Sequence, residues 1–369
     1  MKNSSVTFLW RRADAASQFS TGVCLHGHTM HSEECLSFLP RYLHRVPGVS
    51  QLVSRYQRGP RPQVDFSRAY WTPPLSPISA LTLEREQITK LGLQSLVSLT
   101  DHDNIEAGTS LQVTASGREA PISVEWTAPF HRSIFHLGIH NLPPSAAPSW
   151  MSAMATYTAT ENEHVLREIL SSLAAIPEVL IVLNHPFWLE EGVEEIDHRR
   201  ALARFLSDHI AWVHAFELNG TRRWRENAAA MELAGIHSRP LVSGGDRHAC
   251  EPAACLNLTN APSFSEFAAE VKAGHSSVLF LPHYRQPMAL RLLEASCEIL
   301  RRYPEYPGRE RWIDRVFYRT EDGTAQTLAA LWQNCEPWVI RPVSSALQLL
   351  GTTHVRMTLR ILMSSQVEI

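Results

Sequence analysis

The chain has 369 residues, of which 44% are hydrophobic and 19% are charged, and its formal net charge is −3. This is the composition of an ordinary globular protein, and the charge excludes a broad basic surface for DNA or RNA. We expect no membrane span, because no apolar run is long enough to cross a bilayer, and no signal peptide, because Arg11 and Arg12 follow a short apolar stretch. The six cysteines include no Cys-x-x-Cys pair, so we expect reduced thiols and a cytoplasmic protein.

Runs of strand character alternate with helical patterns along the first 285 residues, as in a parallel α/β architecture. The first run, 23–26, leads into a pair of histidines, and a segment rich in Pro and Arg follows it. We expect this segment, 34–78, to be a partly helical insertion that covers the site as a lid or a substrate wall. Further strands are predicted at 96–99, 121–125, 134–139, 179–183, 213–218, 241–243 and 277–281, and helices at 83–91, 161–175, 197–209, 223–233 and 264–272.

The pattern changes beyond His283, where the predicted elements no longer end in ligand-type residues. Helical patterns occur at 288–302 and 328–333. The apolar residues of 355–361 alternate with polar ones, which predicts an exposed strand. We therefore divide the chain into one domain, 1–285, and a C-terminal α+β extension of unknown role, 286–369.

Most of the predicted strands end in histidines or carboxylates. His26 and His28 follow the first strand, and alternate strand residues face the same side, so both imidazoles can reach one metal. His102 lies in the sequence Thr-Asp-His-Asp; this cluster also suits a helix N-cap, but the preceding strand favours His102 as a ligand that a flanking Asp orients.

Four more segments add to this ligand set. Glu125 closes a strand, where a carboxylate can bridge two metals or form an ion pair, and His136 lies in an apolar run that also suits a core histidine. His185 lies in Asn-His-Pro, and Asp246 and His248 lie in Gly-Gly-Asp-Arg-His. These residues outnumber the ligands of one metal, so we expect two or three divalent ions, and mixed nitrogen and oxygen ligands suit zinc, manganese or iron.

As an ordered set, these motifs resemble the PHP (polymerase and histidinol phosphatase) family of metal-dependent phosphoesterases over roughly residues 20–285. The matching segments are His26-Gly27-His28-Thr29 with Glu33 at the position of a family Asp, Thr100–Asp103, Glu125 with His136 eleven residues later, Asn184–Pro186, and Gly244–His248. Cys24 departs from the family, which usually has Asp there. The resemblance implies a distorted (β/α)7 barrel of the PHP type, with an insertion after the first strand and the C-terminal α+β extension.

The resemblance also implies three metals at the C-terminal ends of the strands. One would be held by His26, His28, Glu125 and Asp246, the second by Glu125, His136 and His185, and the third by Glu33, His102 and His248.

Hydrolysis of a phosphate ester by a metal-activated hydroxide is the leading functional hypothesis, with Asp246, His248 and Glu125 as catalytic residues. Arg247 and Arg222 follow strand ends, so they could grip a phosphate, and Asn219 could contact the substrate. The expected partner is a small phosphorylated substrate or a short nucleic-acid end. No membrane and no obligate protein partner are expected.

Two alternatives stay open at this stage. One is an amidohydrolase-like enzyme that hydrolyses a C–N bond; such barrels normally use a metal-bridging Lys, and no Lys occurs between Lys90 and Lys272. The other is a metal-binding barrel that serves as a non-catalytic interaction module. The near-complete ligand set argues against the module, whereas Cys24 and Glu33 favour it.

Overall fold

The computed structural model describes residues 4–37, 65–251, 253–336 and 340–362. They form a mixed α/β protein with three sheets. The chain divides into two compact units, the first built mainly from residues 4–32 and 75–291 and the second from 33–74 and 292–362. Most of the predicted lid, residues 38–64, lies outside the described residues.

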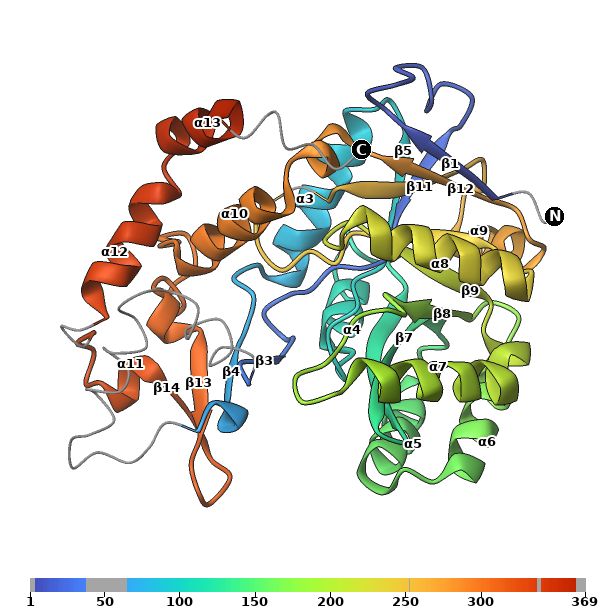
Figure 1. The fold of residues 1–369 in the computed structure, drawn as a ribbon, viewed down its shortest axis with the longest axis horizontal. Helices are drawn as coiled ribbons and strands as arrows, with labels where there is room; N and C mark the ends of the chain where they lie inside the picture. The colour runs from blue at the N-terminus through green and yellow to red at the C-terminus, as the bar shows by residue number, and fades with distance from the viewer. Residues whose placement is uncertain (1–3, 38–64, 252, 337–339, 363–369) are drawn as a thin grey trace. The chain divides into compact units, whose positions relative to one another are not determined.

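The first unit contains two five-stranded sheets (Figure 1). One sheet has its strands in the order β1 (Ser4–Phe8), β12 (Ser276–Phe280), β11 (Cys255–Thr259), β2 (Thr21–Cys24) and β5 (Gln94–Val97). The other sheet has the order β10 (Leu241–Gly244), β9 (Ala215–Asn219), β8 (Leu180–Asn184), β7 (Ser133–Leu142) and β6 (Ile122–Phe130). β2 and β5 are parallel, as are β8, β9 and β10, so the C-terminal ends of the parallel strands in each sheet share an edge.

Two isolated parallel bridges join these sheets, and their partners lie just beyond strand ends except for Glu125, which lies within β6. Gly27 pairs with Arg247, and His102 pairs with Glu125. The backbone N–H of His28 donates to the carbonyl of Arg247 at 2.8 Å, and that of Asp103 donates to the carbonyl of Glu125 at 3.0 Å. The mixed α/β prediction is confirmed. The strands of the described ranges do not form one continuous closed barrel, since only these short bridges connect the two sheets.

Helices follow most strands of the first unit and pack on the sheets because their apolar faces need cover. Their bounds are α3 (Pro77–Thr89), α4 (Glu106–Gln112), α5 (Ala147–Thr160), α6 (Glu163–Ala174), α7 (Glu195–His209), α8 (Trp224–His237) and α9 (Phe264–Lys272). Side chains of Ser76, Asn162 and Ser263 accept backbone N–H groups at the starts of α3, α6 and α9, which fixes where these helices begin.

The second unit contains a small sheet with four short strands. Their order is β14 (Ala325–Thr327), β13 (Val316–Arg319), β4 (Ala69–Trp71) and β3 (Glu34–Cys35). The helices of this part of the chain are α10 (Met288–Leu300), which begins in the first unit, α11 (Leu328–Leu331), α12 (Arg341–Leu350) and α13 (Thr353–Leu362).

The prediction of an exposed strand over 355–361 is wrong, because these residues belong to α13. The apolar residues of this segment fit the two-residue period of a strand, but Val355, Leu359 and Leu362 also fit the 3.6-residue period of a helix. Met357 and Ile361, which suggested the alternation, are 56% and 71% exposed. In the described parts of both units, none of the helices combines the length and the apolar character that a bilayer crossing needs.

Candidate metal centre

The predicted ligands of the first unit gather where its strands end. His26 and His28 follow β2, His102 follows β5, His185 follows β8, and Asp246 and His248 follow β10, while Glu125 and His136 lie on β6 and β7. Close groups of potential ligand atoms are formed by His26 with His28 and Asp246, by His26 with Glu125 and His185, and by His102 with Glu125 and His136. The structure therefore brings together residues that are far apart in the sequence, such as His26 and Asp246, which are 220 positions apart.

Glu125 lies at the middle of this cluster and is fully buried. Its Oε2 atom lies 2.8 Å from His26 Nε2 and 3.3 Å from His28 Nε2. Its Oε1 atom lies 3.1 Å from His185 Nε2 and 3.6 Å from His136 Nδ1. His102 Nε2 also lies 3.5 Å from Oε2, so the two oxygens of one carboxylate face two different groups of imidazoles, which is the arrangement of a ligand that bridges two cations.

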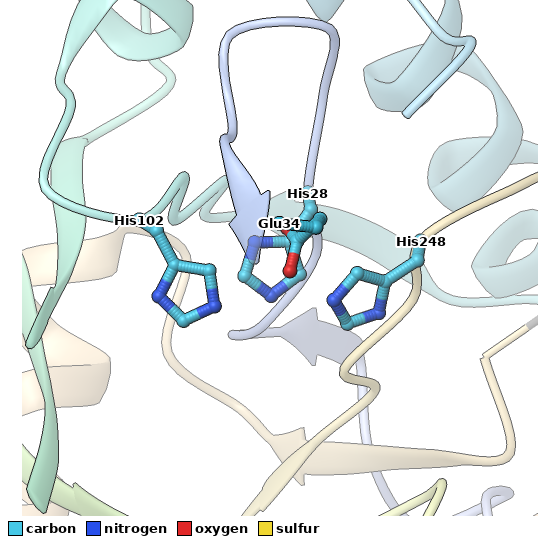
Figure 2. Close-up of side chains that lie close together, drawn as sticks. All are labelled: His28, Glu34, His102 and His248. Carbon is cyan, nitrogen blue, oxygen red and sulfur yellow. The ribbon is translucent and has the colours of Figure 1, made fainter. Parts of the chain in front are cut away.

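Three imidazoles lie side by side at another part of the cluster, as Figure 2 shows. The ring of His28 stacks between those of His102 and His248, with centroid separations of 4.9 and 4.2 Å. The side chain of His248 is 26% exposed and that of His102 is 17% exposed, whereas His28 is buried. His102 and His248 therefore form the part of the cluster that solvent reaches most easily.

Asp246 is oriented by the turn that follows β9. Its Oδ2 atom accepts hydrogen bonds from Asn219 Nδ2 at 3.1 Å, Thr221 Oγ1 at 2.8 Å and Arg222 at 3.2 Å. Its Oδ1 atom lies 3.7 Å from His26 Nε2 and 3.5 Å from His28 Nε2. Three donors thus hold one oxygen and leave the other facing the imidazoles, so Asp246 is arranged to act as a ligand through one oxygen.

The backbone takes uncommon conformations at three of these strand ends. The φ angles of Asp103, His185 and Asp246 are +50°, +24° and +48°. Residues other than Gly rarely adopt positive φ, and such positions persist where surrounding contacts hold them, often at functional sites. Here the conformation turns the side chains of His185 and Asp246 toward the cluster just after the sheet ends.

The spacing of these atoms fits a divalent cation. Two ligand atoms that each lie about 2.1 Å from one cation are about 3.0 Å apart at octahedral angles and about 3.4 Å apart at tetrahedral angles. His26 Nε2 and His28 Nε2 are 3.1 Å apart, and their separations from Glu125 Oε2 are 2.8 and 3.3 Å. Buried imidazoles and carboxylates at these separations form a donor set for divalent metals, and the number of close groups is compatible with more than one ion.

The electrostatics of the cluster also favour a cation. Burial by itself would lower the pKa of His26, but the carboxylates of Glu125, Glu217 and Asp246 raise this pKa well above its usual value. Burial lowers the pKa of His136 well below its usual value, so this imidazole is neutral and its lone pair is free to bind a metal. Although burial alone would raise the pKa of Glu125, the imidazoles of His26 and His102 hold it well below its usual value.

The residues that the sequence suggested for substrate binding lie in different places. Arg222 borders the cluster: its side chain is 16% exposed, it contacts Asp246, and its guanidinium carbon lies 3.8 Å from the centroid of the Trp188 ring. The guanidinium of Arg247 is buried and pairs with Glu84 instead. Asn219 is buried and donates hydrogen bonds to Glu217 at 2.9 Å and to Asp246 at 3.1 Å.

Glu33 belongs to the second unit, where its carboxylate pairs with Arg319. Its assignment to a third cation stays a prediction from the sequence. Cys24, the departure from the family pattern, is buried, and burial together with the nearby Glu84 carboxylate raises the pKa of its thiol well above its usual value. Cys24 is therefore a neutral thiol and cannot replace the carboxylate that is usual at this position.

Several residues that orient the cluster were not identified from the sequence. Glu217 on β9 contacts His26 at 2.6 Å, and Ser32 contacts His28 Nδ1 at 3.2 Å. His198 on α7 lies 2.8 Å from the carbonyl of Pro186, next to His185. The sequence could have identified Glu217 as a site residue, because it is a charged residue inside an apolar strand. It contains no comparable feature that would identify Ser32 or His198.

Two small hollows adjoin His185 and Trp188. One, with about 200 Å³ of empty space, is also lined by Glu217, Asn219 and Arg222. The other, with about 190 Å³, is also lined by His136, Asn184 and His198. The guanidinium of Arg222 therefore borders a space next to the candidate ligands.

No protein-family model matches the sequence, and no curated protein matches it. Among solved structures, the chain is similar to an amidohydrolase from Chromobacterium violaceum with bound sulfate and no metal, at 16% identity and a TM-score of 0.32, over 48% of this chain and 84% of the other. It is also similar to PsfC from Pseudomonas syringae, at 14% identity and a TM-score of 0.36, over 56% and 84%. A third likeness is to a protein described as a metal-dependent phosphoesterase from Bifidobacterium adolescentis, at 14% identity and a TM-score of 0.33, over 55% and 92%. All three likenesses are distant.

Proposed function

We propose that this protein is a metal-dependent phosphoesterase that hydrolyses a phosphate ester at a cluster of two or three divalent cations. The position of Glu125 is the observation that carries the proposal. Its Oε2 atom faces His26 and His28, and its Oε1 atom faces His185 and His136. His26 and His28 follow the same strand, whereas Glu125, His136 and His185 each come from a different strand or strand end. A buried carboxylate encircled in this way is arranged to bridge two cations.

The proposed ligand sets are those that the resemblance to PHP proteins implies, and the distances around Glu125 support the first two. The first cation would be held by His26, His28, Asp246 and Glu125, and the second by His136, His185 and Glu125. A third cation would use His102 and His248, with Glu33 as the ligand that the resemblance to PHP proteins assigns. Mixed nitrogen and oxygen ligands suit zinc, manganese and iron.

The chemistry of the proposal is divided between the cations and the chain. Bound cations at such a cluster lower the pKa of a water molecule and neutralise the charge on phosphoryl oxygens. Arg222 provides guanidinium donors beside the hollow of about 200 Å³, and the Trp188 ring holds that guanidinium in place. His248, the most exposed of the six clustered imidazoles, faces the incoming substrate.

A small phosphorylated molecule or the end of a short nucleic acid is the proposed substrate. The hollow lined by His185, Asn219 and Arg222 places a guanidinium next to the candidate ligands, which suits the phosphate group of a small molecule or of a nucleic-acid end. Arg222 contributes one local positive charge at this site. That charge suits one phosphate group, and the formal net charge of −3 gives no reason to expect a long nucleic acid as the partner.

A panel of substrates tests the proposal on protein reconstituted with zinc, manganese or ferrous iron. Phosphomonoesters, phosphodiesters, short oligonucleotides and amides are compared by the release of phosphate, nucleotide or amine. We expect release of phosphate or nucleotide that Asp246→Ala abolishes and that the matched variant Asp197→Ala retains, because Asp197 lies on α7 and is not a candidate ligand. Turnover of amides alone, or full activity in Asp246→Ala, would contradict the proposal.

A further inference from the structure

A buried carboxylate outside the ligand sets contacts two of the proposed ligands. Glu217 on β9 is 2% exposed. Its Oε1 atom lies 2.6 Å from His26 Nδ1, and its Oε2 atom accepts the backbone N–H of His185 at 2.8 Å. Oε2 also accepts a hydrogen bond from Asn219 Nδ2 at 2.9 Å. Both oxygens are therefore engaged, and their partners are residues of the cluster or of the turn that orients it.

The neighbouring strand leaves room for this carboxylate. Gly244 lies on β10, beside β9, and a Cβ atom added to it would lie 1.6 Å from Glu217 Oε1 and 2.6 Å from its Cδ atom. Real atoms cannot approach so closely, so any side chain at position 244 would displace Glu217. Gly244 immediately precedes the turn that carries Asp246, and its lack of a side chain is a condition for the contact between Glu217 and His26.

The contact determines which nitrogen of His26 faces the cluster. A histidine that binds a metal through Nε2 must be neutral, and because a carboxylate accepts a hydrogen bond, the remaining proton would then lie on Nδ1, toward Glu217. The lone pair of Nε2 is then directed toward Glu125 Oε2 and His28 Nε2, at 2.8 and 3.1 Å. Metal-binding histidines usually have such a carboxylate or carbonyl partner, which fixes the ring and raises its basicity.

The second contact supports a conformation that the backbone rarely adopts. His185 has a φ angle of +24°, and its N–H donates to Glu217 Oε2. This hydrogen bond satisfies a buried donor at the point where β8 ends and the chain turns. The His185 ring then reaches Glu125 Oε1 at 3.1 Å.

We propose that Glu217, in the space left by Gly244, is a positioning residue that orients one ligand of each of the two cations bridged by Glu125. His26 belongs to the first ligand set and His185 to the second, so a single carboxylate acts on both. The inference rests on the proposed function, because it assigns Glu217 a role toward cations held by these ligands. Glu217 itself is not a ligand in this assignment.

The test measures cation binding to the purified full chain. Zn²⁺ affinity is measured by competition with a chromophoric chelator, and the ligand geometry is followed by the visible absorption of the protein loaded with Co²⁺. Glu217→Gln keeps the shape of the side chain but removes its charge, so we expect affinity to fall about 10- to 100-fold and the Co²⁺ spectrum to change. Glu294→Gln is the matched control, since Glu294 is also a buried carboxylate, paired with Arg360 in the second unit. It should keep wild-type affinity.

A second variant covers the case in which Glu217→Gln does not fold. Glu217→Ala removes the carboxylate and leaves Gly244 unchanged, because a Cβ atom at position 244 would also lie 2.9 Å from His26 Cβ, and it should show the same loss of affinity. Wild-type Zn²⁺ affinity and an unchanged Co²⁺ spectrum in a folded variant would overturn the inference while the proposed function stands. Absence of bound Zn²⁺ and Co²⁺ in the wild-type protein would overturn both.

Discussion

The guanidinium carbon of Arg222 lies 3.8 Å from the centroid of the Trp188 ring, so the two side chains stack. The stacking holds Arg222 beside the cluster, where it also contacts Asp246. We predict that Trp188→Leu weakens the binding of inorganic phosphate to the metal-loaded protein about three- to ten-fold, because the guanidinium loses its support. Isothermal titration calorimetry measures the effect. Trp188→Phe keeps an aromatic face and should retain most of the affinity; equal losses in both variants would exclude the stacking as the cause.

A second prediction concerns the assignment of Glu33 to a third cation. Its carboxylate pairs with Arg319, and the two side chains are 48% and 46% exposed. We expect Glu33→Gln to remove the most weakly bound cation. Arg319→Met should raise the affinity for that cation about two- to five-fold, because an exposed ion pair competes only weakly for the carboxylate. Glu321→Gln is the matched control, since Glu321 is another exposed carboxylate of the second unit, and loss of the cation in that variant as well would contradict the assignment of Glu33.

The second unit depends on one buried arginine. Arg315 is 1% exposed and donates hydrogen bonds to the carbonyls of Arg309 at 2.6 Å and Ile299 at 2.7 Å, among others. Replacement by Met leaves these buried acceptors without donors, so we predict that Arg315→Met lowers the free energy of unfolding by about 3 kcal/mol. Urea denaturation measures the loss. Arg302→Met, at a side chain that is 69% exposed, should change stability by less than about 0.5 kcal/mol.

Stability should fall with acid because of His214. Burial, together with Lys272 and Arg239, lowers the pKa of His214 to about 3, and its Nδ1 atom accepts the backbone N–H of Ile181. The pKa of His214 is lower in the folded protein than in the unfolded chain. The contribution of this histidine to the free energy of unfolding is therefore complete above about pH 6.5 and is lost as the pH falls from there toward 3. Below pH 6 this group should make the free energy of unfolding decrease by about 1 kcal/mol per pH unit. His214→Asn retains an acceptor, so a slope as steep as that of the wild type would contradict this account.

Much of the first unit could be predicted from sequence because its strands and helices have clear periods. The predicted helix at 264–272 has the same bounds as α9, and the predicted strands at 179–183 and 241–243 lie within one residue of β8 and β10. The strand β11 was missed because buried Asn257 interrupts its apolar pattern, although its side chain satisfies backbone groups of neighbouring strands. The helix α5 was missed because Ser and Thr occupy many of its positions.

For the ligands that follow β2, β5, β8 and β10, the convergence followed from the rule that parallel strands place their C-terminal ends at a shared edge. Glu125 does not close its strand as predicted but lies inside β6, which is antiparallel to β7. The direction of individual side chains was harder to predict. Asp246 and His248 turn toward the cluster, whereas the residue between them, Arg247, turns toward Glu84, and the positive φ of Asp246 shows that this segment does not continue the regular alternation of β10. The sequence did not predict which segments form the second unit. Residues 33–74 and 292–362 are far apart in the sequence, and only tertiary packing brings them together.

The number of cations that the purified protein retains tests the central claim most directly. The wild-type chain and Glu125→Gln are loaded with Zn²⁺, separated from free ion by gel filtration, and analysed by mass spectrometry for metal and by absorbance for protein. The proposed bridging role of Glu125 predicts at least two ions per wild-type chain and at most one in the variant. A wild-type chain that retains no ion, or a variant that retains as many ions as the wild type with the same affinity, would contradict it.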